Sequence, residues 1–382
     1  MRILIFLTGG TICSEYNGDV KVQGKTAGTV LEKNFNDSSS KFAGRVTFIT
    51  TENYGIFSED MTTDRWEKLI GIMREMPHFR DTAIRHGCCR ALKGREIGSE
   101  ENICDGIIIA HGTDTLAYSS ALFSILLKNV GVPVFIVSSN ESLEKKRANG
   151  CDNFRAAVEC ICKGIKPNVY VTYRNVSDGK MYLHYASRLT QCRNYEEDFT
   201  SVGMVGLEED DRDFFSETSY INEKSDPLPI DIFDEPRLYD AVMRIDPYVG
   251  MNYDFYNFSG VKAILHGTYH SGTVCAGDIS GRDRNSFFRL MNLSGDIPIF
   301  VAPSDLNGGI YETVDILEKY CKNNAPGKVR FINGFTNEML YVKLLLAYSN
   351  EELIPDADRF VTCELNREII KRNNTAETND FC

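Results

Sequence analysis

A chain of 382 residues is longer than one small hydrophobic core needs, so its length favours two domains. The hydrophobic content of 42% supports a packed globular protein, whereas a formal net charge of −12 argues against binding of nucleic acid, whose phosphates need clustered Lys and Arg. Apolar runs in the sequence fall short of the ~18 residues of a membrane span, so neither nucleic acid nor a membrane is an expected partner.

The N-terminal apolar run reads as a strand and not as a secretory signal. Residues 3–7 are shorter than the ~7–15 apolar residues of a signal peptide, and residues 8–12 (Thr-Gly-Gly-Thr-Ile) follow at once. We therefore predict a strand over residues 2–7 and a cytoplasmic protein. The paired glycines permit a tight turn, but the spacings of dinucleotide and phosphate loops are absent, so no cofactor is expected.

Twelve cysteines raise the question of a metal site. Cys88-Cys89 and the pair Cys160 and Cys162 lack the spacing of zinc ligands, and no second pair lies at a suitable distance. We expect no metal, and free thiols in a reducing cytoplasm.

Strands and helices alternate along the first half of the chain. A polar stretch, residues 13–41, reads as a mobile lid followed by a short helix, and Asp60 or Thr62 could cap a helix at 62–75. The pattern continues with strands at 45–50, 106–110, 132–138 and 168–173, and with helices near 99–104, 116–129 and 153–162. This alternation implies a parallel sheet with right-handed crossovers.

The second half begins with a β-arm and an acidic linker. The turn at residues 177–180 leads into a strand at 181–186, and charged and proline-rich stretches follow at 208–213 and 226–229. A second α/β pattern has strands at 241–245, 261–265, 299–302 and 329–331, before a frayed tail at 371–382. We predict an N-terminal catalytic domain (1–205), an acidic linker (206–238) and a C-terminal α/β domain (239–382).

Two threonine-rich turns are the candidates for chemistry. Residues 8–12, here the first Thr turn, and residues 111–115 (His-Gly-Thr-Asp-Thr), the second Thr turn, each follow a predicted parallel strand, so both open on one edge of the sheet. A Thr hydroxyl is a poor nucleophile unless a base or cation assists it, and two hydroxyls beside an acid could share that work. The alternative is that such turns only cap helices.

These turns resemble the two signatures of the bacterial-type asparaginase/glutaminase amidohydrolase family, and both are intact. Leu116-Ala117-Tyr118 after the second turn is similar to the cytoplasmic type I members. Residues 58–61 with Trp66 are similar to the loop that binds the substrate carboxylate in the family. Asn149-Gly150 and Asn153 fall where the family has Asp-Gly and Asn. The resemblance covers residues 1–162, and only the domain plan is shared beyond. It implies a two-domain α/β fold with a larger, mostly parallel N-terminal sheet carrying a β-arm.

The resemblance also implies roles for individual residues. Thr11 would be the nucleophile that forms an acyl-enzyme, and Thr113 would belong to the second hydroxyl group of the site. Asp114 would hold the α-ammonium of the substrate, and Ser58 with Glu59 would receive its α-carboxylate and amine. Charge-assisted hydrogen bonds of this kind orient a zwitterion firmly.

Three positions depart from the family pattern or match it only in part. His184 stands where the family has a Lys, and Lys180 would start roughly 13 Å away along the strand. His184 could be a base near neutral pH or only a packing residue. The family has a tyrosine in the lid over its site, and Tyr16 lies closer in sequence to the nucleophile than that tyrosine does. Glu312 and the turn at 266–270 are candidates to reach a neighbouring subunit's site, since family members are dimers or tetramers.

The sequence therefore predicts an amidohydrolase that releases ammonia from L-asparagine and assembles as a homodimer or homotetramer. The alternatives are an L-glutaminase, or a catalytically impaired amino-acid-binding or regulatory homologue. An amidase subunit of a tRNA-dependent amidotransferase ranks lower, because that related family has an N-terminal extension whereas this chain starts at its first strand and is acidic.

Overall fold

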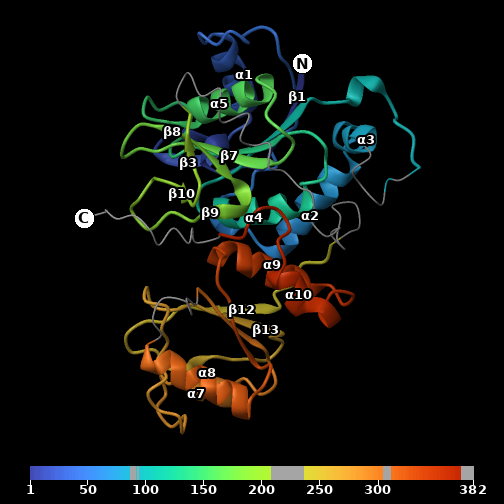
Figure 1. The fold of residues 1–382 in the computed structure, drawn as a ribbon. Coiled ribbons are helices and arrows are strands. Elements are labelled where there is room, and N and C mark those ends of the chain that lie inside the picture. The colour runs from blue at the N-terminus through green and yellow to red at the C-terminus, as the bar shows by residue number, and fades with distance from the viewer. Residues whose placement is uncertain (87–91, 93, 208–235, 304–310, 371–382) are drawn as a thin grey trace, which may run out of the picture. The chain divides into compact units, whose positions relative to one another are not determined.

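The computed structural model describes residues 1–86, 92, 94–207, 236–303 and 311–370 (Figure 1). The chain divides into two compact units, Met1–Leu238 and Tyr239–Cys382. Several sequence predictions lie outside the described residues: Cys88-Cys89, the stretches 208–213 and 226–229, Gly308-Gly309 and the tail 371–382. Within the described residues, no helix is both long and apolar enough to cross a membrane.

Unit 1 is built on a seven-stranded sheet, and the predicted α/β class is confirmed. The strand order is β11 (Val205–Gly206), β8 (Met181–Tyr185), β7 (Val169–Arg174), β6 (Val134–Val137), β5 (Gly106–Ala110), β1 (Arg2–Leu7) and β4 (Thr47–Thr50). The five strands from β7 to β4 are parallel, and β8 and β11 add antiparallel at one edge. This edge is the predicted β-arm.

The strand order reverses between β1 and β5. From β1 the chain first adds β4 on one side, and then returns to add β5, β6 and β7 on the other. The carboxyl ends of two adjacent strands whose connections leave in opposite directions form the crevice in which open α/β sheets bind ligands. The fold therefore brings the two Thr turns to that crevice.

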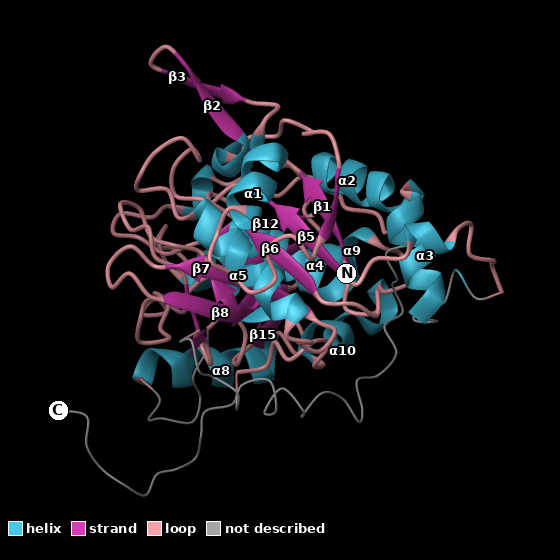
Figure 2. Ribbon diagram, turned by 90° about the horizontal axis from the view of Figure 1, so that it is seen from above, coloured by secondary structure: helices cyan, strands magenta, loops and turns pink. Residues whose placement is uncertain are grey.

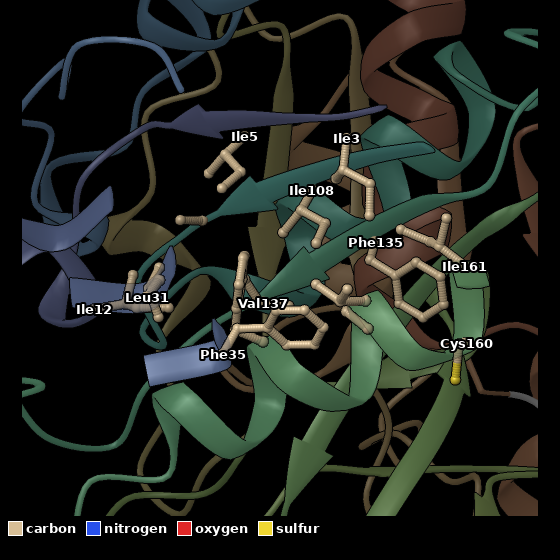
Figure 3. Packing of buried hydrophobic residues seen from close by; sticks show 14 of the residues in the cluster. Ile3, Ile5, Ile12, Leu31, Phe35, Ile108, Phe135, Val137, Cys160 and Ile161 are labelled. Carbon is tan, nitrogen blue, oxygen red and sulfur yellow. The ribbon is translucent and has the colours of Figure 1, made fainter. Parts of the chain in front are cut away.

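Helices cover both faces of this sheet. Helices α1 (Ala27–Asn36) and α5 (Gly150–Cys162) lie on one face, and α2 (Thr63–Glu75) and α4 (Leu116–Leu126) on the other (Figure 1). Figure 3 shows the first interface, where alternate strand residues such as Ile3, Ile108 and Phe135 meet Phe35 and Ile161 of the helices. Every residue of β5 is buried, as its uninterrupted apolar sequence predicts.

Two segments of unit 1 differ from the sequence prediction. The stretch predicted to be a mobile loop contains a hairpin, β2 (Ser14–Asn17) paired with β3 (Val20–Gln23), which stands out from the sheet in Figure 2. The helix expected near 99–104 is only a short 3-10 turn, η4 (Glu100–Asn102), and the helix before it is α3 (Pro77–His86). Thr62 caps α2 by accepting a hydrogen bond from the Arg65 amide (3.3 Å).

The remaining short elements of unit 1 flank the site: η1 (Thr11–Cys13), η2 (Ser58–Asp60), η5 (Ala186–Arg188), β9 (Leu189–Thr190) and β10 (Thr200–Ser201). Strands β9 and β10 pair antiparallel. Together with η5 they lead the chain from β8 back towards the helical layer that contains α4.

Unit 2 is a smaller α/β sandwich. Its four parallel strands run in the order β12 (Val242–Ile245), β13 (Ala263–His266), β14 (Ile299–Val301) and β15 (Val329–Phe331). Helices α7 (Phe287–Leu293) and α8 (Glu312–Asn324) pack on one face, and α9 (Asn337–Ser349) and α10 (Ala357–Thr362) lie on the other; η7 (Tyr253–Phe255) and η8 (Ile354–Asp356) are short 3-10 turns (Figure 1).

Candidate active site

The two Thr turns touch each other through their glycines. Both the amide and the hydroxyl of Thr8 donate to the carbonyl of Ala110, at 3.0 and 2.9 Å, which fixes the start of one turn to the end of β5. Gly10 has φ = 77°, and a Cβ atom built on it would lie 2.2 Å from the Cα of Gly112. Only glycine permits this approach, so the backbone itself holds the two turns together.

Thr11 follows Gly10 directly and begins η1. The carbonyl of Gly10 accepts hydrogen bonds from the amide of Cys13 (3.0 Å) and the hydroxyl of Ser14 (2.9 Å). Thr11 itself is half-buried. A half-buried hydroxyl on a backbone fixed from both sides is suited to attack a bound substrate, because little motion is needed to align it.

A third segment, residues 54–60, joins the two turns. Ser58 is buried, and its hydroxyl donates to Oδ2 of Asp114 (2.8 Å) and accepts from the Asp114 amide (3.2 Å). Ile56 exchanges two backbone hydrogen bonds with the first Thr turn, through Gly10 and Thr8. Ser58 and Asp114 are thus brought together as the resemblance implies, and Glu59 is the next, exposed, residue of η2.

A pocket of about 540 Å³ opens beside the second Thr turn. Thr113 and Asp114 form part of its lining, and the rest comes from residues after β6, from β7 and from the segment between β9 and β10: Asn140, Tyr173, Gln191, Cys192, Arg193, Asn194, Tyr195, Glu196, Glu197 and Phe199. Its charged lining consists of the carboxyl groups of Asp114, Glu196 and Glu197 and the guanidinium of Arg193. The excess of negative charge favours a ligand with a positively charged group.

Asparagine side chains brace the wall of this pocket. Asn140 and Asn149 each donate a backbone amide to the other's side-chain oxygen, at 2.9 and 3.0 Å, and Asn140 also donates its side-chain amide to Glu197 (3.1 Å). Asn153 donates its side-chain amide to the carbonyl of Ser138 (2.8 Å). Through further hydrogen bonds to the last residue of β7, Asn149 and Asn153 tie together the ends of β6 and β7.

The histidine of the second Thr turn is structural in character. His111 is buried, and its Nδ1 lies 2.8 Å from the carbonyl oxygen of Gly112. Burial lowers the pKa of His111 to about 4, because desolvation disfavours the imidazolium ion. A neutral His111 donating from Nδ1 to that carbonyl fits this environment.

His184 is buried within the sheet of unit 1. It lies in β8, opposite Val171 of β7, with no exposed surface, and its Nδ1 is 2.9 Å from the hydroxyl of Ser201. Burial lowers the pKa of His184 to about 3, because desolvation disfavours the imidazolium ion. Within the described residues, its hydrogen bonding leads to Ser201 and not to Thr113 or Asp114. Its burial favours the packing residue over the base, the two interpretations that the sequence leaves open, whereas its Nε2 is buried without a hydrogen-bond partner among the described residues.

The two remaining predicted site residues lie on other elements. Tyr16 is in the β2–β3 hairpin, with the ammonium of Lys145 4.2 Å from its ring centroid, so the hairpin contacts the loop after β6. Glu312 is the first residue of α8 in unit 2. The segment from Gln191 to Glu197 escapes prediction from the sequence, because its contacts with the second Thr turn join residues far apart in the chain.

A family model described as "Asparaginase, N-terminal" matches residues 95–209, which include the second Thr turn. The thermostable L-asparaginase from Thermococcus kodakarensis has the same fold, with a TM-score of 0.67 and 19% sequence identity over 97% of this chain and all of that one. The chain is therefore similar to asparaginases in the sequence of residues 95–209 and in its fold. The family resemblance and the two-domain fold predicted from the sequence are therefore confirmed.

Other relatives of this asparaginase-like chain belong to two groups. L-asparaginase I from Vibrio cholerae superposes with a TM-score of 0.63 and 18% identity, covering 97% of this chain and 99% of that one. The chain is also 24% identical to a glutamyl-tRNA(Gln) amidotransferase subunit from Thermoplasma acidophilum and to its counterpart from Methanococcus maripaludis, over 55% and 70% of its own length. It spans only 45% and 63% of those relatives.

Proposed function

We propose that this protein is an amidohydrolase that converts L-asparagine to L-aspartate and ammonia. The observation that carries the proposal is the contact between Gly10 and Gly112, since it supports a site in which Thr11 acts beside Thr113 and Asp114. The hydroxyl oxygen of Thr11 attacks the carbon of the side-chain amide, ammonia leaves, and water hydrolyses the resulting ester.

The charges at the second Thr turn fit an amino-acid substrate. Asp114 binds the α-ammonium group, and the neighbouring Ser58 hydroxyl, already 2.8 Å from that carboxylate, contributes hydrogen bonds to the same end of the substrate. Glu59 adds a second carboxylate near the amine, and Tyr16 of the hairpin closes over the site. His184 has no part in this mechanism, because its neutral ring is committed to the interior of the sheet.

Two alternatives remain to be separated by experiment. The relatives named as amidotransferase subunits make L-glutamine the second amide to test. The burial of His184, at the position where related enzymes have a Lys, favours as a further candidate a homologue that binds an amino acid without turnover.

The deciding experiment measures ammonia release from L-asparagine and from L-glutamine by the purified full chain, with Thr11→Ala and Thr11→Ser as paired variants. We expect turnover by the wild type, none with alanine, and partial activity with serine, which keeps a hydroxyl. Activity that survives Thr11→Ala would remove the assigned nucleophile. Tight L-aspartate binding by calorimetry without turnover would select the binding homologue instead.

We also propose that the chain assembles as a homodimer or homotetramer, with Glu312 reaching the site of a neighbouring copy. Light scattering on a size-exclusion column measures the mass in solution. A monomer that retains full activity would contradict the proposal.

A further inference from the structure

Helix α4, which begins at the second Thr turn, has no side-chain cap of its own. Thr115 occupies the N-cap position, but its hydroxyl donates to the carbonyl of Ser58 (3.0 Å) instead of accepting from the first amides of the helix. The first four amides of any helix lack partners within the helix and need an outside acceptor. The Thr113 carbonyl accepts a hydrogen bond from the Leu116 amide (3.2 Å), and the Ala117 amide takes its acceptor from another segment.

Gln191 supplies that acceptor from 74 residues farther along the chain. Its Oε1 accepts a hydrogen bond from the amide of Ala117 at 3.1 Å. Its Nε2 donates to the carbonyl of Thr113 at 2.8 Å. One primary amide thus bridges the second Thr turn and the first turn of α4, using its donor on one and its acceptor on the other.

This bridge requires the chemistry of a primary amide. Only the side chains of Asn and Gln carry a carbonyl acceptor and an N–H₂ donor side by side without charge. A carboxylate could still accept from Ala117, but it would place a negative oxygen against the carbonyl oxygen of Thr113. An apolar side chain of similar size would remove the acceptor of the Ala117 amide, and the Thr113 carbonyl would keep only its longer hydrogen bond from the Leu116 amide (3.2 Å).

Gln191 also connects the turn to the wall of the pocket. It directly follows β9, which is held by its pairing with β10, and it is the first residue of the segment that lines the 540 Å³ pocket together with Asp114. Its side chain therefore links this wall to the carbonyl of Thr113.

We propose that Gln191 is a positioning residue of the reaction, which sets Thr113 and Asp114 in place relative to Thr11. This inference rests on the proposed amidohydrolase function. Because Gln191 acts through the second Thr turn, its loss should affect both the orientation of the substrate's ammonium group and the alignment of the attacking hydroxyl. Misplacement of reacting groups by about 1 Å costs on the order of 100-fold in rate.

The test compares Gln191→Leu, Gln191→Glu and the control Thr190→Ala, a change at the neighbouring exposed residue outside the pocket. We expect kcat/KM for L-asparagine to fall between about tenfold and 100-fold in Gln191→Leu, with KM raised and kcat lowered together. The control should stay within about twofold of the wild type. A Gln191→Leu enzyme with wild-type kcat and KM would overturn the proposal.

Gln191→Glu provides a readout that a merely structural role would not give. Once protonated, the glutamic acid can donate to the Thr113 carbonyl and restore both hydrogen bonds. The activity of this variant relative to the wild type at the same pH should therefore rise by about fivefold or more as the pH is lowered from 8 towards 5, since the nearby Asp114 carboxylate and the carbonyl oxygen favour the protonated acid. A ratio that stays constant with pH would contradict the bridge.

Hydrogen exchange separates failure of this inference from failure of the proposed function. If the wild type hydrolyses neither amide, the proposed function fails. The positioning role is still tested, because the amide of Ala117 should exchange about fivefold faster in Gln191→Leu than in the wild type when its acceptor is removed. Unchanged exchange at Ala117 would overturn the inference whatever the activity.

Discussion

Replacing Gly10 by alanine should push the two Thr turns apart, because the added methyl group has no space. The new Cβ would lie 2.2 Å from Cα and 2.4 Å from the amide nitrogen of Gly112. Both of these are backbone atoms, which cannot rotate away as a side-chain end can. Gly10 also has φ = 77° and ψ = −171°, a conformation that residues with a Cβ rarely adopt.

The magnitude follows from these two effects. Carbon atoms in contact lie about 3.5–4.0 Å apart, so the turns must separate by more than about 1 Å. Overpacking of this kind costs about 1–3 kcal/mol, and the backbone conformation about 1–3 kcal/mol more. Alanine restricts the unfolded chain more than glycine does, which offsets about 0.4–1 kcal/mol of this cost, so we expect a net loss of about 1–6 kcal/mol in the free energy of unfolding.

Urea unfolding of the full chain measures this loss, and ammonia release should fall on the order of 100-fold in the fraction that stays folded. The matched control is Gly18→Ala. Gly18 also has positive φ, 64°, but a Cβ there would meet nothing within 4 Å, so only the backbone strain of about 1 kcal/mol applies. Equal effects of the two variants, or a Gly10→Ala protein with wild-type stability and activity, would refute the reasoning.

Two further predictions concern buried charge. Burial lowers the pKa of His111 and His266 to about 4 and that of His184 to about 3. These three neutral histidines therefore contribute fully to stability above the unfolded-state pKa of about 6.5. Their contribution is lost as the pH falls from about 6.5 towards the folded-state pKa values. The free energy of unfolding, measured by urea titration, should decrease between pH 7 and pH 4, and it should decrease less steeply in His184→Gln. The same dependence on pH in both proteins would count against a buried neutral His184. In unit 2, Lys343 and Glu368 form an ion pair of 2.8 Å with both side chains fully buried. Lys343→Met should lower the free energy of unfolding by about 3–5 kcal/mol, because it leaves the buried carboxylate of Glu368 without its counter-ion. Adding Glu368→Gln should recover more than half of that loss. A double variant as unstable as the single one would exclude this explanation.

Much of the fold can be predicted from local sequence. The sequence predicts strands β1 and β5 at the bounds that the structure has, because an apolar run that ends in glycine and threonine is a complete local signal for a buried parallel strand. The sequence also predicts that the two Thr turns open on one edge of the sheet. Their contact depends on β1 and β5 being neighbouring strands, which the structure shows.

Other local signals account for elements that the sequence prediction leaves out. Gly18-Asp19 forms the two-residue loop of the β2–β3 hairpin, and glycine at the first loop position is a recognised hairpin signal within the predicted loop. Helix α3 begins at Pro77, a residue that favours the first position of a helix. Both elements are within reach of reasoning from short windows of sequence.

The sequence by itself determined the α/β class, the central strands and the opening of both Thr turns on one edge of the sheet, because these depend on hydrophobic pattern and turn chemistry within short windows. Only the tertiary structure shows the burial of His184 and the hydrogen bonds of Gln191. The charge of His184 depends on how completely β7, β8 and Ser201 remove it from water, and the bridge made by Gln191 joins residues more than 70 positions apart. Desolvation and long-range hydrogen bonds are set by what packs from elsewhere in the chain, and a short window of sequence does not contain those partners.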